Sequence, residues 1–254
     1  MDSMNRRDAL GRIAIGGAAT VVLASSDVAL AQTGAAPTAP AARAYAGKHD
    51  VLPLPFAPTK LKGISEKMIV SHHDNNYAGA VKNLVKVEGE LGLVTKDTPA
   101  FVLNGLKERE LTYTNSKVLH EYYFGNLGGD GTPSGSIVEE VKGTYGDWGR
   151  WESEFRQTGG ALGGGSAWVI LDYNLYTGAI RTYWSGGHSQ TAATGLPLLV
   201  MDMYEHAYQM DYGAAAAKYI DAFFANVNWD EVNRRLAAAR TAAGAVHGGA
   251  GGKA

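Results

Sequence analysis

A run of chain-breaking residues between positions 128 and 135 constrains the fold more than any other feature of the chain. Four glycines and one proline fall within this stretch, and such clusters interrupt both helices and strands. Before it, residues 61–93 and about 111–126 carry apolar positions three and four residues apart, which predicts two helices, the first starting at Ser65. We therefore expect two halves of different architecture, divided at residue 130.

The second half changes from helical to strand-like patterning and back again. Residues 137–156 are helical in pattern, in one or two pieces, before a glycine-rich stretch. Three short apolar segments rich in β-branched and aromatic residues then follow, the first two separated by a turn that ends at Gly178. Alanine-rich helices are expected after them. The expected strands are residues 166–173, 179–184 and 196–201, and the expected helices are residues 214–226 and 230–242. Helices followed by a small antiparallel sheet indicate an α+β fold.

The first thirty-one residues are typical of a secretory leader. Arg6 and Arg7 precede an apolar run over residues 13–24, and Ala29-Leu30-Ala31 offers small residues to a signal peptidase. The paired arginines indicate the twin-arginine route, with cleavage after about Ala31 and a periplasmic location. A membrane anchor is the alternative, but a bilayer core needs about 20 apolar residues, so we expect no anchor after cleavage.

Composition narrows the remaining possibilities. Residues 32–50 are predicted to be a flexible linker and residues 243–254 a disordered tail, because both are rich in small residues. The body between them has roughly 190 residues, predicted as a helical domain over 51–130 and an α+β domain over 131–242. The chain has no cysteine, which excludes disulfides and thiolate metal sites. A net charge of -2 gives no indication of nucleic-acid binding.

Candidate metal ligands stand out among the histidines of the body. Asp202 and His206 are four residues apart, so on a helical turn both side chains would point to one side. Taken alone, this spacing is more often a surface pair than a metal site. His72 and His73 form an adjacent pair on a predicted helix, and such a pair is also more often structural than ligating.

The wider pattern is more specific. Six segments follow one another along the chain in a characteristic order: Leu52-Pro53-Leu54-Pro55-Phe56, Ser71-His72-His73-Asp74, His120-Glu121-Tyr122-Tyr123-Phe124, Ala167-Trp168-Val169, Met201-Asp202-Met203-Tyr204-Glu205-His206-Ala207-Tyr208 and Val227-Asn228-Trp229-Asp230-Glu231. Together they resemble the iron/manganese superoxide dismutase family over residues 51 to about 240.

The resemblance implies a fold, a metal and a reaction. The fold is a helical N-terminal half built on an antiparallel hairpin, followed by a three-stranded antiparallel sheet surrounded by helices. The ligands of one iron or manganese ion per chain are implied to be His72, His120, Asp202 and His206, with solvent in the fifth place. Nitrogen and oxygen donors suit both metals. The implied reaction converts superoxide to oxygen and hydrogen peroxide.

Residues around the implied metal depart from the usual family pattern. His188 occupies the position that is often glutamine, and we interpret it as the donor to the metal-bound solvent. Asn76 and Ala80 stand where a second histidine and a gateway tyrosine are usual, which predicts a wider and wetter entrance. Trp168 is kept, whereas Tyr204 replaces a tryptophan. Tyr77 lies five residues after His72, about 140° around an α-helix from it, so we expect it not to fill the gateway.

The resemblance also implies self-association. Glu205 matches a residue that reaches across a two-fold interface to the partner's metal-ligating histidine. This predicts a homodimer, with a tetramer as the alternative. Gln209 stands in place of the interface tyrosine that pairs with the residue at position 76. These departures leave a second hypothesis, in which the fold binds metal but has little or no dismutase activity.

Overall fold

The computed structural model describes residues 43–45, 49–165 and 167–248. The predicted leader over residues 1–31 and most of the predicted linker therefore lie outside the described residues, as does Ser166. Within the described part, the helical elements are η2 (Arg43–Tyr45), η3 (Pro58–Lys60), α1 (Glu66–Ser71), η4 (His72–Tyr77), α2 (Ala78–Gly92), α3 (Ala100–Gly125), α4 (Ser136–Tyr145), α5 (Trp148–Leu162), η5 (Glu205–Ala207), α6 (Gln209–Tyr212), α7 (Ala216–Phe224) and α8 (Trp229–Gly248).

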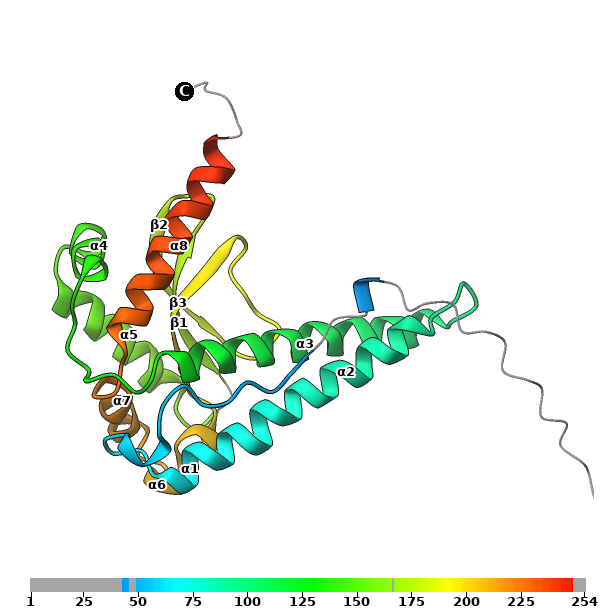
Figure 1. Cartoon of the computed structure of the whole chain (residues 1–254), viewed down its shortest axis with the longest axis horizontal. Helices are drawn as coiled ribbons and strands as arrows, with labels where there is room; N and C mark the ends of the chain where they lie inside the picture. The colour runs from blue at the N-terminus through cyan, green and yellow to red at the C-terminus, as the bar shows by residue number, and fades with distance from the viewer. Residues whose placement is uncertain (1–42, 46–48, 166, 249–254) are drawn as a thin grey trace, which may run out of the picture. The chain divides into compact units, whose positions relative to one another are not determined.

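The N-terminal half is a long helical hairpin. Ser65 caps α1, and its hydroxyl accepts a hydrogen bond from the backbone N–H of Met68 at 3.1 Å. α1, the π-helical turn η4 and α2 then follow without interruption. Figure 1 shows α2 and α3 running side by side in opposite directions. The predicted hairpin is thus confirmed, although α3 begins at Ala100, eleven residues before the expected position of about 111.

The C-terminal half is built on a three-stranded antiparallel sheet, as predicted. Its strands are β1 (Trp168–Asn174), β2 (Ala179–Ser185) and β3 (Gly195–Asp202), in the order β2-β1-β3. Trp168 pairs with Ser185 on one side and with Asp202 on the other. The central strand is buried along almost its whole length, because α5 packs against it while α3 and α8 pack against β3. A strand covered in this way is mostly apolar rather than alternating, and β1 departs from this at the buried Asp172.

Asn126 fixes the end of the hairpin to the sheet. The side chain is fully buried, and its Nδ2 donates to the carbonyl of Val200 at 2.8 Å. Its backbone carbonyl accepts from the N–H of Asn228 at 2.6 Å, just before α8. Buried amides with all groups partnered hold elements in one arrangement. This connection sets the position of α3 relative to β3, and therefore of the side chains that the two elements bring together.

Two local expectations from the sequence were wrong. Asp202 and His206 do not share a helical turn, because Asp202 ends β3 and His206 lies in the 3-10 turn η5. The tail predicted to be disordered from residue 243 is helical as far as Gly248, and Ala243 is buried against the core. The division into two domains at residue 130 stays a prediction. None of the described helices is long and apolar enough to span a membrane.

Candidate metal centre

The four predicted ligands come together from four separate elements. His72 begins η4, His120 lies in α3, Asp202 is the last residue of β3, and His206 lies in η5. One ligand atom from each lies within 4.8 Å of every other. The hairpin and the sheet half thus contribute two side chains each. A single ion can bind all four only when both halves are folded and packed together.

The carboxylate of Asp202 is the centre of the cluster. Its Oδ2 lies 3.1 Å from Nε2 of His72, 3.1 Å from Nε2 of His206 and 3.7 Å from Nε2 of His120. Its Oδ1 accepts a hydrogen bond from the backbone N–H of Tyr204 at 2.8 Å. That bond fixes the carboxylate, so that one oxygen remains directed at the three imidazoles.

Unpartnered ring nitrogens show that the cluster fits a metal ion. His72 and His120 are both 1% exposed. Nδ1 of His72 and Nε2 of His120 have no hydrogen-bond partner among the described residues, and Nε2 of His72 has only Asp202 Oδ2 beside it at 3.1 Å, without hydrogen-bond geometry. Burying polar atoms without partners is costly, and a cation bound by Nε2 of His72 and Nε2 of His120 would remove that cost at these two atoms. Three imidazole nitrogens and one carboxylate oxygen are a donor set suited to iron or manganese.

His120 is oriented by a residue that the sequence analysis missed. Its Nδ1–H donates to the backbone carbonyl of Ser116 at 2.6 Å, which leaves Nε2 with its lone pair directed at Asp202. Ligating histidines commonly donate their second nitrogen in this way. Ser116 precedes His120 by four residues on the same helix, and this spacing could have been used to predict the contact.

Burial sets the protonation states that metal binding requires. It lowers the pKa of His120 to about 3 and also lowers the pKa of His72, so both rings are neutral near pH 7. Burial alone would raise the pKa of Asp202, but the neighbouring His206 and His72 outweigh it and hold that pKa well below its usual range. A carboxylate anion beside neutral imidazoles is the state in which these groups bind metal.

His188 lies beside the cluster, held by Trp168 and Tyr204. The indole Nε1–H of Trp168 donates to Nδ1 of His188 at 3.1 Å. The ring of Tyr204 stacks on the His188 ring with centroids 4.7 Å apart and stacks on the His206 ring at 5.2 Å. Because an indole can only donate, Nδ1 must accept, and in the neutral ring the proton is on Nε2. Burial lowers the pKa of His188, which favours this neutral form.

A cavity of about 250 Å³ opens onto three of these histidines, His120, His188 and His206. The predicted entrance residues Asn76 and Ala80 both line it. Tyr77 does not line this cavity, although the α-helical angle used for it does not apply, because η4 is a π-helix in which i→i+5 residues are bonded. Its hydroxyl instead donates to Glu121 at 2.8 Å.

Glu205 points to the surface. Its side chain is exposed and has no hydrogen bond or ion pair among the described residues. His206, next to it, is the most exposed of the ligands, with 25% of its side chain accessible. The ligand cluster therefore approaches the surface on the side that carries Glu205.

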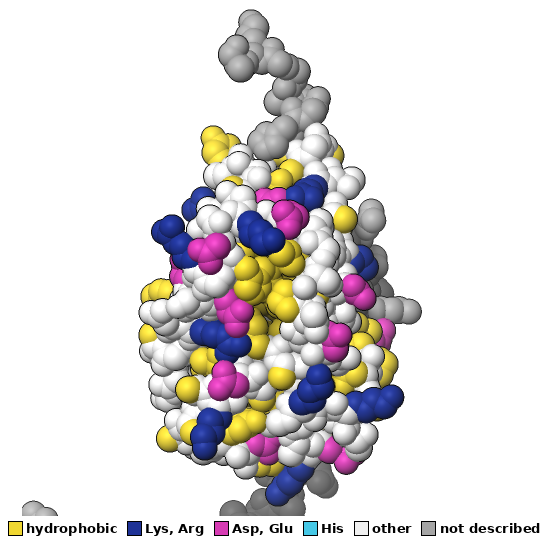
Figure 2. All heavy atoms as spheres, turned by 90° about the vertical axis from the view of Figure 1, so that its left-hand side faces the viewer, with side chains coloured by type: hydrophobic (Ala, Val, Ile, Leu, Met, Phe, Trp, Pro, Cys, Tyr) yellow, Lys and Arg dark blue, Asp and Glu magenta, His cyan; other side chains and the backbone are white. Residues whose placement is uncertain are grey.

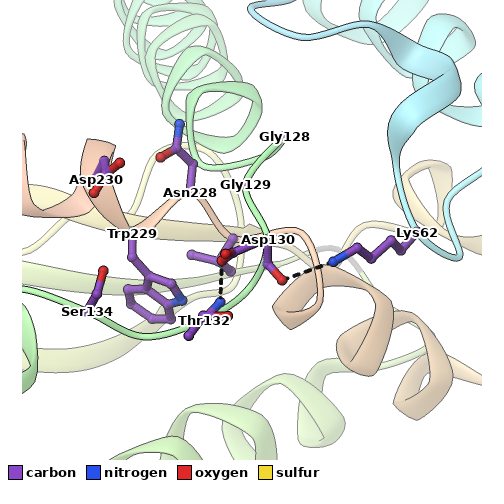
Figure 3. A pocket seen from close by; sticks show the side chains of 10 residues that line it. Lys62, Gly128, Gly129, Asp130, Thr132, Ser134, Asn228, Trp229 and Asp230 are labelled. Carbon is purple, nitrogen blue, oxygen red and sulfur yellow. Dashed lines mark hydrogen bonds between the residues drawn. The ribbon is translucent and has the colours of Figure 1, made fainter.

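Another cavity lies away from this centre. It has a volume of about 600 Å³ and lies where the loop after α3 meets the start of α8. Figure 3 shows the ammonium group of Lys62 donating a hydrogen bond to Asp130, and the indole of Trp229 beside Thr132; no histidine lines this cavity. Figure 2 shows acidic and basic side chains interspersed on the side that carries α4, and no described histidine on that face. Neither region resembles the metal centre.

Comparison with known proteins agrees with the geometry. Residues 133–235 match the C-terminal domain of iron/manganese superoxide dismutases. The chain is 47% identical over 192 residues to a protein of Cupriavidus metallidurans named superoxide dismutase [Fe], covering 75% of this chain and 98% of that protein. The chain belongs to the iron/manganese superoxide dismutase family.

The names of less similar relatives include either iron or manganese. A superoxide dismutase [Fe] of Aquifex aeolicus is 34% identical over 200 residues, covering 75% of this chain and 92% of that protein. A superoxide dismutase [Mn] of Haloferax volcanii is 32% identical over 189 residues, covering 72% of this chain and 92% of that protein. The dismutase described here accordingly has a mononuclear site for iron or manganese.

In this dismutase centre, the metal ion and the protein have different roles. Bound iron or manganese supplies the change of oxidation state that superoxide dismutation needs. The protein holds the four donors in place, keeps the buried imidazoles of His72 and His120 neutral, and presents an open cavity beside the cluster. Superoxide is converted there to oxygen and hydrogen peroxide. The complete donor set favours the enzyme over the alternative of a metal-binding protein without activity.

Proposed function

We propose that this superoxide dismutase works as an exported homodimer in which His188 donates a hydrogen bond to the solvent molecule at the fifth metal position. The observation that carries the catalytic part is the hydrogen bond from Trp168 to Nδ1 of His188. It leaves the Nε2–H of His188 as a donor beside the cavity that opens onto His120 and His206. Tyr204, stacked on the same ring, keeps that ring in one orientation.

Unused groups on Glu205 and His206 support the dimer. Nε2 of His206 faces Asp202, so its Nδ1–H remains available on the outer side of the ring. The exposed carboxylate of Glu205 is an acceptor of the right chemistry. In a two-fold dimer, each Glu205 would accept from the His206 of the other chain, and both ligands would be oriented at once. Asn76 and Gln209 would meet as an amide pair in the same interface.

The dimer is tested with the variant Glu205→Ala. We expect a dimer-to-monomer shift at micromolar concentration in analytical ultracentrifugation, together with weaker metal retention. Glu108→Ala removes an exposed carboxylate on α3 and should leave the dimer intact. A Glu205→Ala protein that stays dimeric with full metal content would contradict the proposed contact.

Export through the twin-arginine route is supported by Arg6 and Arg7 ahead of the apolar run over residues 13–24. This route carries folded proteins, so the metal could be inserted before export. The absence of cysteine from the sequence means that an oxidising compartment cannot alter the protein through thiols.

Cell fractionation tests this proposal directly. Dismutase activity should appear in the periplasm, carried by a chain that begins near residue 32 when its mass is measured. The double variant Arg6→Lys, Arg7→Lys should accumulate uncleaved in the cytoplasm. Equal periplasmic amounts of the double variant and the unchanged protein would exclude the twin-arginine route.

A further inference from the structure

The cavity beside the metal centre lies in the groove between α2 and α3. Asn76, Ala80 and Asn83 recur at helical spacing and present one face toward it, while Tyr113, Ser116 and His120 do the same from α3. Three of the lining residues, Gly79, Ala80 and Ser116, are small. The groove is therefore a path that both helices build, and it leads to the imidazole ligands.

The reaction consumes protons. One superoxide is oxidised to oxygen, and a second accepts the electron and takes up two protons to give hydrogen peroxide. None of the cavity-lining residues carries a carboxylate or an ammonium group. The side chains of the wall that bear a hydroxyl are Tyr113 and Ser116. Ser116 is buried, with its Oγ 3.4 Å from Nδ1 of His120, which leaves Tyr113 as the accessible hydroxyl.

The other tyrosines near the centre are placed differently. Tyr77 donates to Glu121 and accepts from the N–H of Leu52. Tyr123 is fully buried and accepts a hydrogen bond from Tyr219 at 3.2 Å. Tyr204 is stacked on His188 and does not line the cavity. The Tyr113 hydroxyl has no hydrogen-bond partner among the described residues, and it lies on a half-buried side chain at the cavity wall.

We propose that Tyr113 is a channel residue of this dismutase. Its hydroxyl donates a hydrogen bond to the incoming superoxide anion and relays protons from solvent along the groove. The proton that leaves the hydroxyl is replaced from water, so the side chain is unchanged after each turnover. The phenol that the resemblance places at position 80 is thus supplied here from the opposite helix. This inference rests on the dismutase activity of the chain.

The variant Tyr113→Phe tests the hydroxyl while keeping the ring. Azide serves as a small anion probe, titrated by absorbance into the iron-loaded protein. We expect azide binding to weaken by about 3- to 10-fold, the usual value of one hydrogen bond, and the turnover of superoxide to fall about 10-fold, most strongly at high pH where free protons are scarce. Tyr176→Phe, altered at a side chain that is 77% exposed on the β1–β2 turn, should change neither.

A second variant separates this role from a packing effect. Adding a phenol on the opposite wall, in Tyr113→Phe combined with Ala80→Tyr, should restore azide binding toward the original value. Tyr113→Phe with unchanged azide affinity and unchanged turnover would overturn the proposal. If the unchanged protein, loaded with metal, showed no activity, the dismutase reaction itself would be wrongly assigned. That result differs from an active protein in which Tyr113→Phe has no effect, so the two failures can be told apart.

Discussion

The ligand cluster and the cavity wall beside it differ in how strictly chemistry fixes their residues. The cluster places four donors within 4.8 Å of one another, three of them buried, and each matches the position expected from the resemblance. The wall combines amides and small residues at positions 76, 80, 83 and 116 with one phenol at 113. A metal requires particular donor atoms in a fixed geometry, whereas a path for a small anion and for protons can be built from several side chains. The first region therefore identifies the family, whereas the second is less constrained by chemistry.

The largest effect is expected from removing the carboxylate at the centre of the cluster. Asp202→Ala leaves three imidazoles and no anionic donor, so metal affinity should fall by more than about 100-fold and activity should be lost. Metal content after purification, measured by elemental analysis, is the readout. Asp172→Asn alters another fully buried aspartate of the sheet and should keep its metal. An Asp202→Ala protein with a full complement of metal would show that the cluster is not the binding site.

A smaller effect is expected at His188, which lies between the two regions. His188→Ala should reduce turnover by about 100-fold while metal content stays unchanged, because Nε2 of this residue donates to solvent rather than binding the ion. His188→Gln, which restores a donor, should recover part of the rate. Loss of metal from His188→Ala would instead place this residue among the ligands.

Most of the ligand cluster could be predicted from the sequence because the donors lie in distinctive motifs. The cap at Ser65 and the three strands were also predictable, since capping and strand patterns are local. The turn that joins Asp202 to His206 was not, because four-residue spacing is shared by helices and by a strand followed by a 3-10 turn. The π-helical turn that begins at His72 was not predicted either; within it His73 and Tyr77 pack against Phe124 of α3, a contact that no local pattern records.

The early start of α3 was missed for a similar reason. The first part of the helix is exposed nearly all around, including Phe101 at 79%, so it has no apolar stripe from which periodicity could be recognised. The predicted disordered tail began too early in the chain because the alanines and glycines after residue 242 resemble a linker in composition. Ala239 and Ala243 are buried against the core, and α8 extends to Gly248.

The smallest effect is expected in a part of the sheet remote from the metal. Asp172 is fully buried, neither carboxylate oxygen has a hydrogen-bond partner among the described residues, and burial raises its pKa to about 6. Since the folded pKa is above the unfolded value, the folded state binds more protons between about pH 4 and 6. The free energy of unfolding should therefore fall as the pH rises through this range, by about 1–3 kcal/mol.

Asp172→Asn removes this dependence. The variant should be more stable than the unchanged protein at pH 8 and similar to it at pH 4, as measured by denaturant unfolding of the metal-free protein at both pH values. If the variant and the unchanged protein had equal free energies of unfolding at pH 8, ionisation of Asp172 in the folded state would cost no stability. Metal content should not change, which keeps this effect separate from the ligand cluster.

The most direct test of the central claim is a metal analysis combined with a dismutase assay on the purified protein, loaded separately with iron and with manganese. The account predicts one ion per chain and superoxide dismutase activity that rises in proportion to the bound metal in at least one of the two forms. One ion bound per chain with no activity in either form would contradict it.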